Sequence, residues 1–136
     1  MDKYIYSAIF EPCESIGYTI TFPDLPGCIT EGDTLTEALS MAKEALELHL
    51  YGMEEDADVI PIPTAPEKIE VDPGCFVVPI EAYMPLIREE MANKTVKKTL
   101  TIPNWLNKVA EEKNVNFSQI LQLALKNHLG IREINK

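Results

Sequence analysis

The chain has 136 residues, of which 46% are hydrophobic and 25% are charged, and its formal net charge at pH 7 is -10. This length suits one domain or one domain with a small appendage, and the apolar fraction excludes a disordered chain. The first apolar run, at residues 4–10, is too short to span a membrane and follows no signal-peptide pattern, so we expect a soluble, cytoplasmic protein.

The charges are divided unevenly along the chain. Residues 1–92 hold 4 Lys and Arg against 19 Asp and Glu, a balance of -15, whereas residues 93–136 hold 8 against 3, a balance of +5. A basic tail is suited to bind an anion, and an acidic body is suited to bind a cationic partner or to keep the chain in solution.

The N-terminal part predicts three strands. Residues 3–11 are rich in aromatic and β-branched types, residues 16–22 alternate apolar side chains with threonines, and residues 28–32 form a short third strand. The segment 12–15 suits a hairpin, and the prolines of 22-FPDLPG-27 predict a turn.

A helix follows these strands. Thr34 and Glu37 form a capping box, and apolar residues then recur at helical spacing. Residues 54–74 are rich in proline and acidic side chains, which indicates an exposed connection. Residues 75–83 predict a fourth strand, in which Pro79 favours an edge position. The body is therefore predicted to be a small α+β domain with the order β-β-β-α-β and a helix on one face of the sheet.

The C-terminal part predicts one strand and two helices. We expect a body at 1–83, a linker at 84–93 that is a hinge or a short helix, and a tail domain at 94–136. The strand of the tail ends at Pro103, which opens the first helix, and Asn116 caps the second helix.

A tail of this size cannot bury enough surface to fold alone, and a single strand leaves both of its edges unpaired. Pairing with the same strand of a second chain would bury more surface and give the strand a neighbour, which predicts a homodimer. Pairing of the bodies as well would give a tetramer. Leu100 and Ile102 would then face the helices, while Lys97, Thr99 and Thr101 would face outward. A two-stranded ribbon fits the major groove of DNA, and its two-fold symmetry matches a palindromic site. The same pattern is also compatible with a plain dimerisation element.

Residues 94–130 resemble the ribbon-helix-helix family of DNA-binding proteins. The resemblance implies that the alternating strand residues contact base edges, here Lys97, Thr99 and Thr101. It also implies that the start of the second helix holds a DNA phosphate, a role that maps onto Asn116, Phe117 and Ser118 and that suits any helix N-terminus. Lys94 and Lys98 are further phosphate candidates, and Lys98 departs from the family because an apolar, inward residue is usual there.

No catalytic, metal or cofactor site is predicted. A two-metal nuclease site needs an inward carboxylate in the middle of the first strand, and that strand has none. The cysteines and histidines lack the close spacing of zinc ligands; they are Cys13, Cys28, Cys75, His49 and His128.

The phrase 22-FPDLPGCITEGDT-34, preceded by a tyrosine-rich strand and followed by EAL, resembles the HicB family of antitoxins over residues 3–83. The resemblance implies a degenerate ribonuclease-H-like body without nuclease activity, whose partner is a HicA toxin, a small basic ribonuclease that cleaves messenger RNA. It implies as well that the protein represses its own operon. Three exposed acids are candidates for toxin contact, namely Glu31, Asp33 and Glu37.

Two other functions remain open from the sequence. One is a stand-alone transcriptional repressor whose N-terminal domain binds another effector or protein. The other is a hydrolase with an unrecognised carboxylate site.

Overall fold

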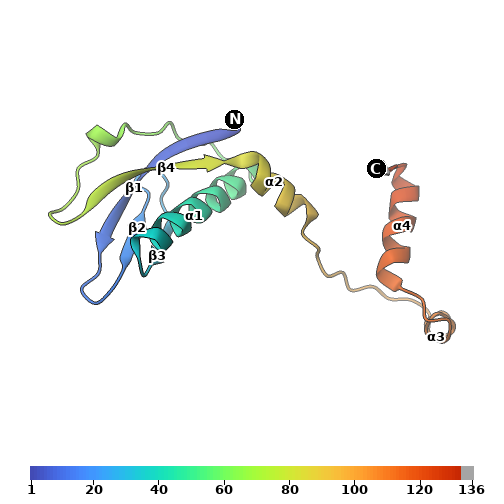
Figure 1. Ribbon diagram of the computed structural model, residues 1–136. Helices are drawn as coiled ribbons and strands as arrows, with labels where there is room; N and C mark the ends of the chain where they lie inside the picture. The colour runs from blue at the N-terminus through green and yellow to red at the C-terminus, as the bar shows by residue number, and fades with distance from the viewer. Residues whose placement is uncertain (133–136) are drawn as a thin grey trace. The chain divides into compact units, whose positions relative to one another are not determined.

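The computed structural model of the chain describes residues 1–132 (Figure 1). The chain divides into two compact units, Met1–Thr95 and Val96–Lys136. The first unit combines an antiparallel sheet with helices and is an α+β domain, as predicted. In the part of the chain that the structure describes, no helix is both long enough and apolar enough to cross a membrane.

The sheet of the first unit is antiparallel throughout, with the strand order β3-β2-β1-β4. Its central strand β1 pairs along nearly its whole length with β4, from Lys3 opposite Tyr83 to Phe10 opposite Phe76. The other neighbour of β1 is shorter, and only residues 9–12 of β1 pair with β2. The four strands of the described residues are β1 (Lys3–Pro12), β2 (Tyr18–Thr21), β3 (Ile29–Gly32) and β4 (Phe76–Tyr83).

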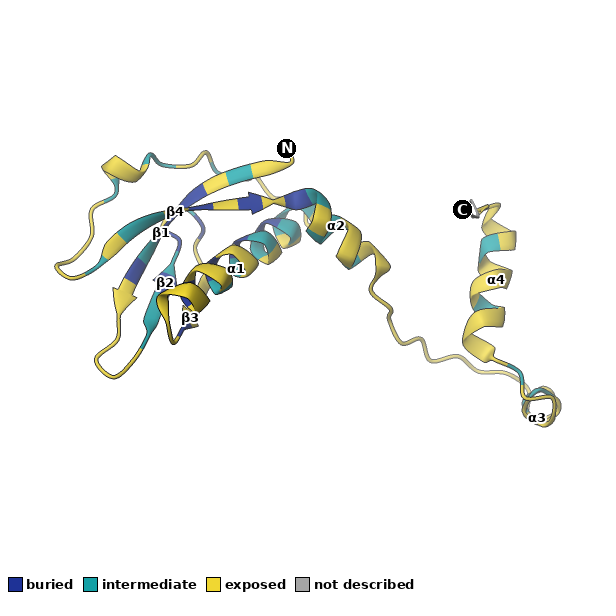
Figure 2. Cartoon of the chain, viewed as in Figure 1, coloured by how far each residue is buried: buried dark blue, intermediate teal, exposed yellow. Residues whose placement is uncertain are grey.

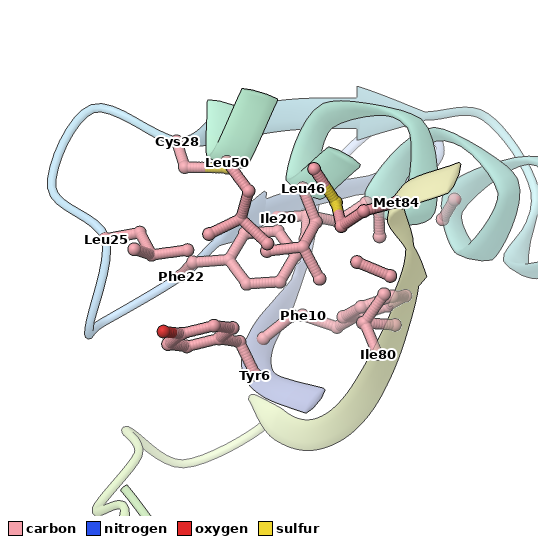
Figure 3. Close-up of a cluster of buried hydrophobic side chains, with 14 residues drawn as sticks. Tyr6, Phe10, Ile20, Phe22, Leu25, Cys28, Leu46, Leu50, Ile80 and Met84 are labelled. Carbon is pink, nitrogen blue, oxygen red and sulfur yellow. The ribbon is translucent and has the colours of Figure 1, made fainter. Parts of the chain in front are cut away.

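Helix α1 (Leu35–Glu55) covers one face of this sheet. Its start is confirmed as predicted, because the Thr34 hydroxyl accepts a hydrogen bond from the Glu37 N–H at 3.1 Å. The helix buries a stripe of small and apolar side chains, Ala38, Ala42, Leu46 and Leu50. These pack on the alternate residues of β1 and β2 that face the helix, which include Tyr6, Ala8, Phe10 and Ile20 (Figure 3).

The turn after β2 contributes to the same core rather than only reversing the chain. Phe22, Leu25 and Cys28 are each at most 3% exposed. The backbone folds over itself there, since the Leu25 N–H donates to the Phe22 carbonyl and the Cys28 N–H to the Leu25 carbonyl, each at 3.0 Å. Burial raises the pKa of the Cys28 thiol to about 11, so this thiol stays protonated and inert at neutral pH.

A glycine allows the sheet and the helix to approach closely. A Cβ atom built on Gly32 would lie 2.6 Å from the Cα and N atoms of Ala38, well inside a normal contact. Glycine at the end of β3 therefore allows the first turn of α1 to pack directly on the backbone of the sheet.

The connection between α1 and β4 contains little regular structure, as predicted, apart from the short 3-10 turn η1 (Pro66–Lys68). Pro79 does lie in an edge strand, because β4 pairs only with β1. The proline lacks an N–H group, so this edge of the sheet offers fewer donors to a further strand.

Residues 84–93, predicted to be a linker formed by a hinge or a short helix, form helix α2 (Met84–Asn93) within the first unit. Arg88 fixes this helix: its guanidinium contacts the Glu54 carboxylate at 2.6 and 3.0 Å and the Asp2 carboxylate at 2.9 Å. Met84, at the start of α2, is fully buried. The boundary between the two units therefore lies after α2, at residues 95 and 96.

The ion pair of Arg88 predicts a pH-dependent stability. Hydrogen bonding to Arg88 lowers the pKa of the Glu54 carboxyl below its ordinary 4.5, and the same bond raises the pKa of Arg88. A carboxyl whose pKa is lowered by folding stabilises the fold above its unfolded pKa, and that contribution disappears as the pH falls through the folded pKa. We expect Glu54→Gln to lower the free energy of unfolding by about 1 kcal/mol at pH 7, the usual order for a partly exposed bidentate pair. Urea unfolding at pH 7 and pH 3 should show this difference shrink in acid; a difference that persists unchanged would contradict the assignment.

The second unit contains helices α3 (Asn104–Glu112) and α4 (Phe117–Leu129). From Val96 to Arg132 no described residue is buried, and Figure 2 shows this part of the chain almost entirely as exposed. Its large apolar side chains face solvent too; Trp105 is 67% exposed and Ile120 is 54% exposed. The second unit therefore lacks a hydrophobic core of its own.

Candidate functional site

The basic segment before α3 is extended and exposed in the single chain. Residues 94–103, which include the strand predicted to end at Pro103, have no strand partner among the described residues and are not assigned as a strand. The physical reason is that a β-strand needs a neighbour for its backbone hydrogen bonds, and the prediction placed that neighbour in a second chain. Lys94, Lys97, Lys98, Thr99 and Thr101 are all exposed there.

The apolar residues of this segment are exposed as well. Leu100 and Ile102, predicted to face the helices, are 57% and 46% exposed in the single chain. Val96, two positions before Lys98, is 86% exposed. The structure of one chain thus leaves both faces of the segment without cover.

The start of α4 has the geometry of a capped helix N-terminus. The side-chain oxygen of Asn116 accepts a hydrogen bond from the Gln119 N–H at 3.1 Å. Asn114, in the turn between α3 and α4, has a positive φ of 54°. Asn116, Phe117 and Ser118 are all exposed, so the first turn of α4 is accessible to an anion.

The acids predicted to contact a toxin lie on β3 and at the start of α1. Glu31, Asp33 and Glu37 are exposed. The Glu37 side chain has a local role, because its carboxylate accepts a hydrogen bond at 3.4 Å from the N–H of Asp33, the residue before the N-cap Thr34. A contact through Glu37 would therefore compete with the cap of α1.

Sequence reasoning missed a second acidic region, at the other end of α1. Asp24, Asp56 and Asp58 line a hollow together with apolar residues from α1 and from the segment after it. Asp24 lies 32 residues before Asp56 in the sequence, so only the fold brings Asp24 to the same hollow as Asp56 and Asp58. The acidic residues of the proline-rich connection were the available signal, but the sequence analysis predicted only an exposed connection there.

No group of three or more His, Cys, Asp or Glu side chains among the described residues could hold a metal ion. The Asp24 carboxylate accepts two hydrogen bonds from Thr64, one from the Thr64 N–H and one from the Thr64 hydroxyl, each at 2.7 Å.

The chain is similar to known antitoxins in both sequence and fold. It is 45% identical over 58 residues to "Antitoxin HicB 1" of Photorhabdus laumondii, an alignment that covers 43% of this chain and 37% of that protein. The first curated relatives are matched over 34% to 43% of their length, which is less than half.

Two solved structures share the fold. A chain of a toxin-antitoxin complex from Streptococcus pneumoniae has a TM-score of 0.62 and 24% identity, with 93% of this chain and 99% of that chain covered. A chain of a HicA3 and HicB3 toxin-antitoxin complex has a TM-score of 0.50 and 24% identity, with 57% and 95% covered.

A family model described as "HicB_like antitoxin of bacterial toxin-antitoxin system" matches residues 6–124, which include parts of both units. This match confirms the family predicted from the FPDLPG phrase and the sequence around it. Its members are antitoxins rather than enzymes. The chain therefore belongs to the HicB-like antitoxin family of bacterial toxin-antitoxin systems.

Proposed function

We propose that this chain binds and inhibits a HicA-type toxin through its first unit and represses its own operon through its second unit. The observation that carries the proposal is the division of the chain into two units of opposite charge, of which only the first has a buried core. In this proposal the first unit works as a folded monomer, and the second unit folds with a second copy.

The body supports toxin binding by its charge and its fold. A surface rich in carboxylates attracts a cationic, RNA-binding partner and competes with RNA for it. A relative by fold is found in a complex named for HicA3 and HicB3, and we infer the same class of partner for this chain. We assign the body to a degenerate ribonuclease-H-like sheet, whose central strand β1 has no carboxylate between Lys3 and Phe10.

The tail supports a ribbon-helix-helix dimer by what it leaves exposed. Its apolar side chains on the extended segment and on both helices face solvent, and a second copy of the same unit would cover them. An interleaved pair would give each strand its missing neighbour and bury residues such as Leu100, Ile102 and Trp105. Pairing of the bodies as well would make a tetramer.

Such a dimer would present its basic ribbon to operator DNA. Lys97, Thr99 and Thr101 alternate along the segment and would contact base edges in the major groove. Phosphates on either side would be held by Lys94 and Lys98 and by the first turn of α4, at Asn116, Phe117 and Ser118. The two-fold symmetry of the dimer predicts a palindromic operator.

The proposal is tested by identifying the protein and the DNA that bind to the purified chain. Tagged full-length chain, purified from its native cells, should carry a small basic protein encoded by the adjoining gene. The same preparation should retard a DNA fragment from its own promoter in a gel. A preparation that retards the promoter but carries no such protein would instead support a stand-alone repressor.

Replacement of Lys97 tests the DNA-binding ribbon. Lys97→Ala removes one phosphate or base contact per chain, hence two per dimer, and we expect the slope of log K against log salt concentration to fall by about 2. The affinity for operator DNA at 0.1 M salt should fall at least about tenfold. Lys68→Ala in the body removes the same charge at an exposed position of η1 and serves as the matched control. Equal slopes for the two variants would exclude the ribbon as the DNA-contacting element.

A further inference from the structure

A hollow in the first unit lies where the C-terminal half of α1, the FPDLPG turn and the segment after α1 meet. Its apolar lining includes Leu48 and Met53 from α1 and Val59 from the following segment. Leu48 is 43% exposed and Val59 is 90% exposed, so the lining presents apolar surface that the chain itself leaves uncovered. Exposed apolar residues gathered in one concave region mark a binding surface more often than scattered ones do.

The segment that forms one wall of this hollow is held in place. The Asp58 N–H donates to the Met53 carbonyl at 2.9 Å, which fixes the segment to the end of α1. Further on, the Tyr6 hydroxyl donates to the Pro61 carbonyl, and Thr64 donates twice to Asp24. These bonds anchor the backbone on both sides of Val59, so the segment holds the exposed Val59 side chain at the edge of the hollow.

The charge of the hollow indicates the chemistry of its occupant. Asp24, Asp56 and Asp58 are among the residues that line it, and none of the described lining residues is Lys or Arg. A second hollow, between α1 and α2, is also lined by three carboxylates, Glu44, Glu47 and Glu90, but its lining includes the cation Lys94 as well. The first hollow therefore repels nucleic acid and favours a protein surface in which lysine or arginine side chains surround an apolar side chain.

We propose that the hollow bounded by Asp24, Leu48, Asp56, Asp58 and Val59 is the docking site for the toxin, with an apolar side chain of the toxin seated against Leu48 and Val59. Basic side chains around it then pair with the three aspartates. This inference rests on the proposed toxin partner, and it places the contact at the C-terminal end of α1 rather than at Glu31, Asp33 and Glu37 near its start.

The test uses two charge-reversal pairs in the full-length protein and the purified HicA-type toxin encoded by the adjoining gene. Asp56→Lys with Asp58→Lys changes the hollow, and Glu31→Lys with Asp33→Lys is the matched control. Each pair moves the formal net charge from -10 to -6, since each replacement adds two positive charges. All four positions are exposed, so both variants should fold and should retain operator binding. A lysine at the C-terminal end of α1 also suits the helix dipole there.

Binding of the toxin, measured by titration calorimetry at 0.15 M salt, should weaken at least about 30-fold for the Asp56 and Asp58 pair and less than about threefold for the control pair. The uncharged replacement Val59→Ser should weaken binding about tenfold, as the loss of an apolar contact at the centre of an interface does. The inference is wrong if both charge-reversal pairs lose the same affinity for the toxin, because the net charge of the protein alone would then explain the loss. It is wrong too if only the control pair loses affinity. A wild-type chain that does not bind the toxin would overturn the proposed function itself, and the docking site with it.

Discussion

A chain cut after Thr95 should lose specific operator binding while it still neutralises the toxin. The second unit supplies the basic segment and both helices of the proposed DNA-binding dimer, whereas the first unit keeps its entire buried core. We expect operator affinity to fall at least about 100-fold, to the level of non-specific binding or below, because an acidic body repels DNA. Toxin affinity should change less than about threefold. Gel retardation and calorimetry on the same preparation measure both quantities.

The position of the cut matters, and a second truncation shows why. A chain cut after Tyr83 lacks α2 and so loses Arg88, with its contacts to Glu54 and Asp2, and the buried Met84. It should therefore be less stable than the chain cut after Thr95, by about 3 kcal/mol for the buried methionine together with the ion pairs.

Loss of toxin neutralisation in the chain cut after Thr95 would show that the tail takes part in toxin binding.

Replacement of Gly32 by alanine should destabilise the body strongly. The new Cβ would lie 2.6 Å from the backbone of Ala38, and neither β3 nor the first turn of α1 can move without disturbing the core beneath them. Overpacking of this kind costs about 2–3 kcal/mol. Urea unfolding followed by circular dichroism would show the transition at a lower denaturant concentration.

Gly52 provides the matched control for this replacement. It lies inside α1, is exposed, and an added Cβ would meet no atom within 4 Å. Gly52→Ala should therefore stabilise the chain by about 0.5–1 kcal/mol, because alanine is the better helix former. The two substitutions thus have opposite signs, and a Gly32→Ala variant at least as stable as Gly52→Ala would contradict the close packing of β3 on α1.

Features set by local chemistry could be predicted from the sequence. The cap of α1 could be predicted because Thr34 and Glu37 have the three-residue spacing of a capping box. The edge position of Pro79 could be predicted because proline cannot donate a hydrogen bond to a neighbouring strand. The family was also predictable, since the FPDLPG phrase keeps its turn residues and its buried Leu25 together in one short segment.

Features set by distant contacts were missed. A short helix was one of the two expectations for residues 84–93, but its packing on the body was not predicted, because its anchor, Arg88, pairs with Asp2 and Glu54, which are 86 and 34 residues away. The hollow at the end of α1 was missed for the same reason: the bonds from Thr64 to Asp24 join positions 40 residues apart. Alternation and spacing describe neighbours along the chain, and they contain no information on which remote side chains will meet.

Because no described residue of the second unit is buried, the two proposed activities should respond differently to protein concentration. A body with its own core folds in a unimolecular reaction, so dilution does not weaken it, whereas a tail completed by a second copy is subject to mass action. Each tenfold fall in concentration removes about 1.4 kcal/mol from the assembled tail and nothing from the body. As the antitoxin is depleted, the promoter would then be released first, and new synthesis would begin while the remaining monomers still hold the toxin.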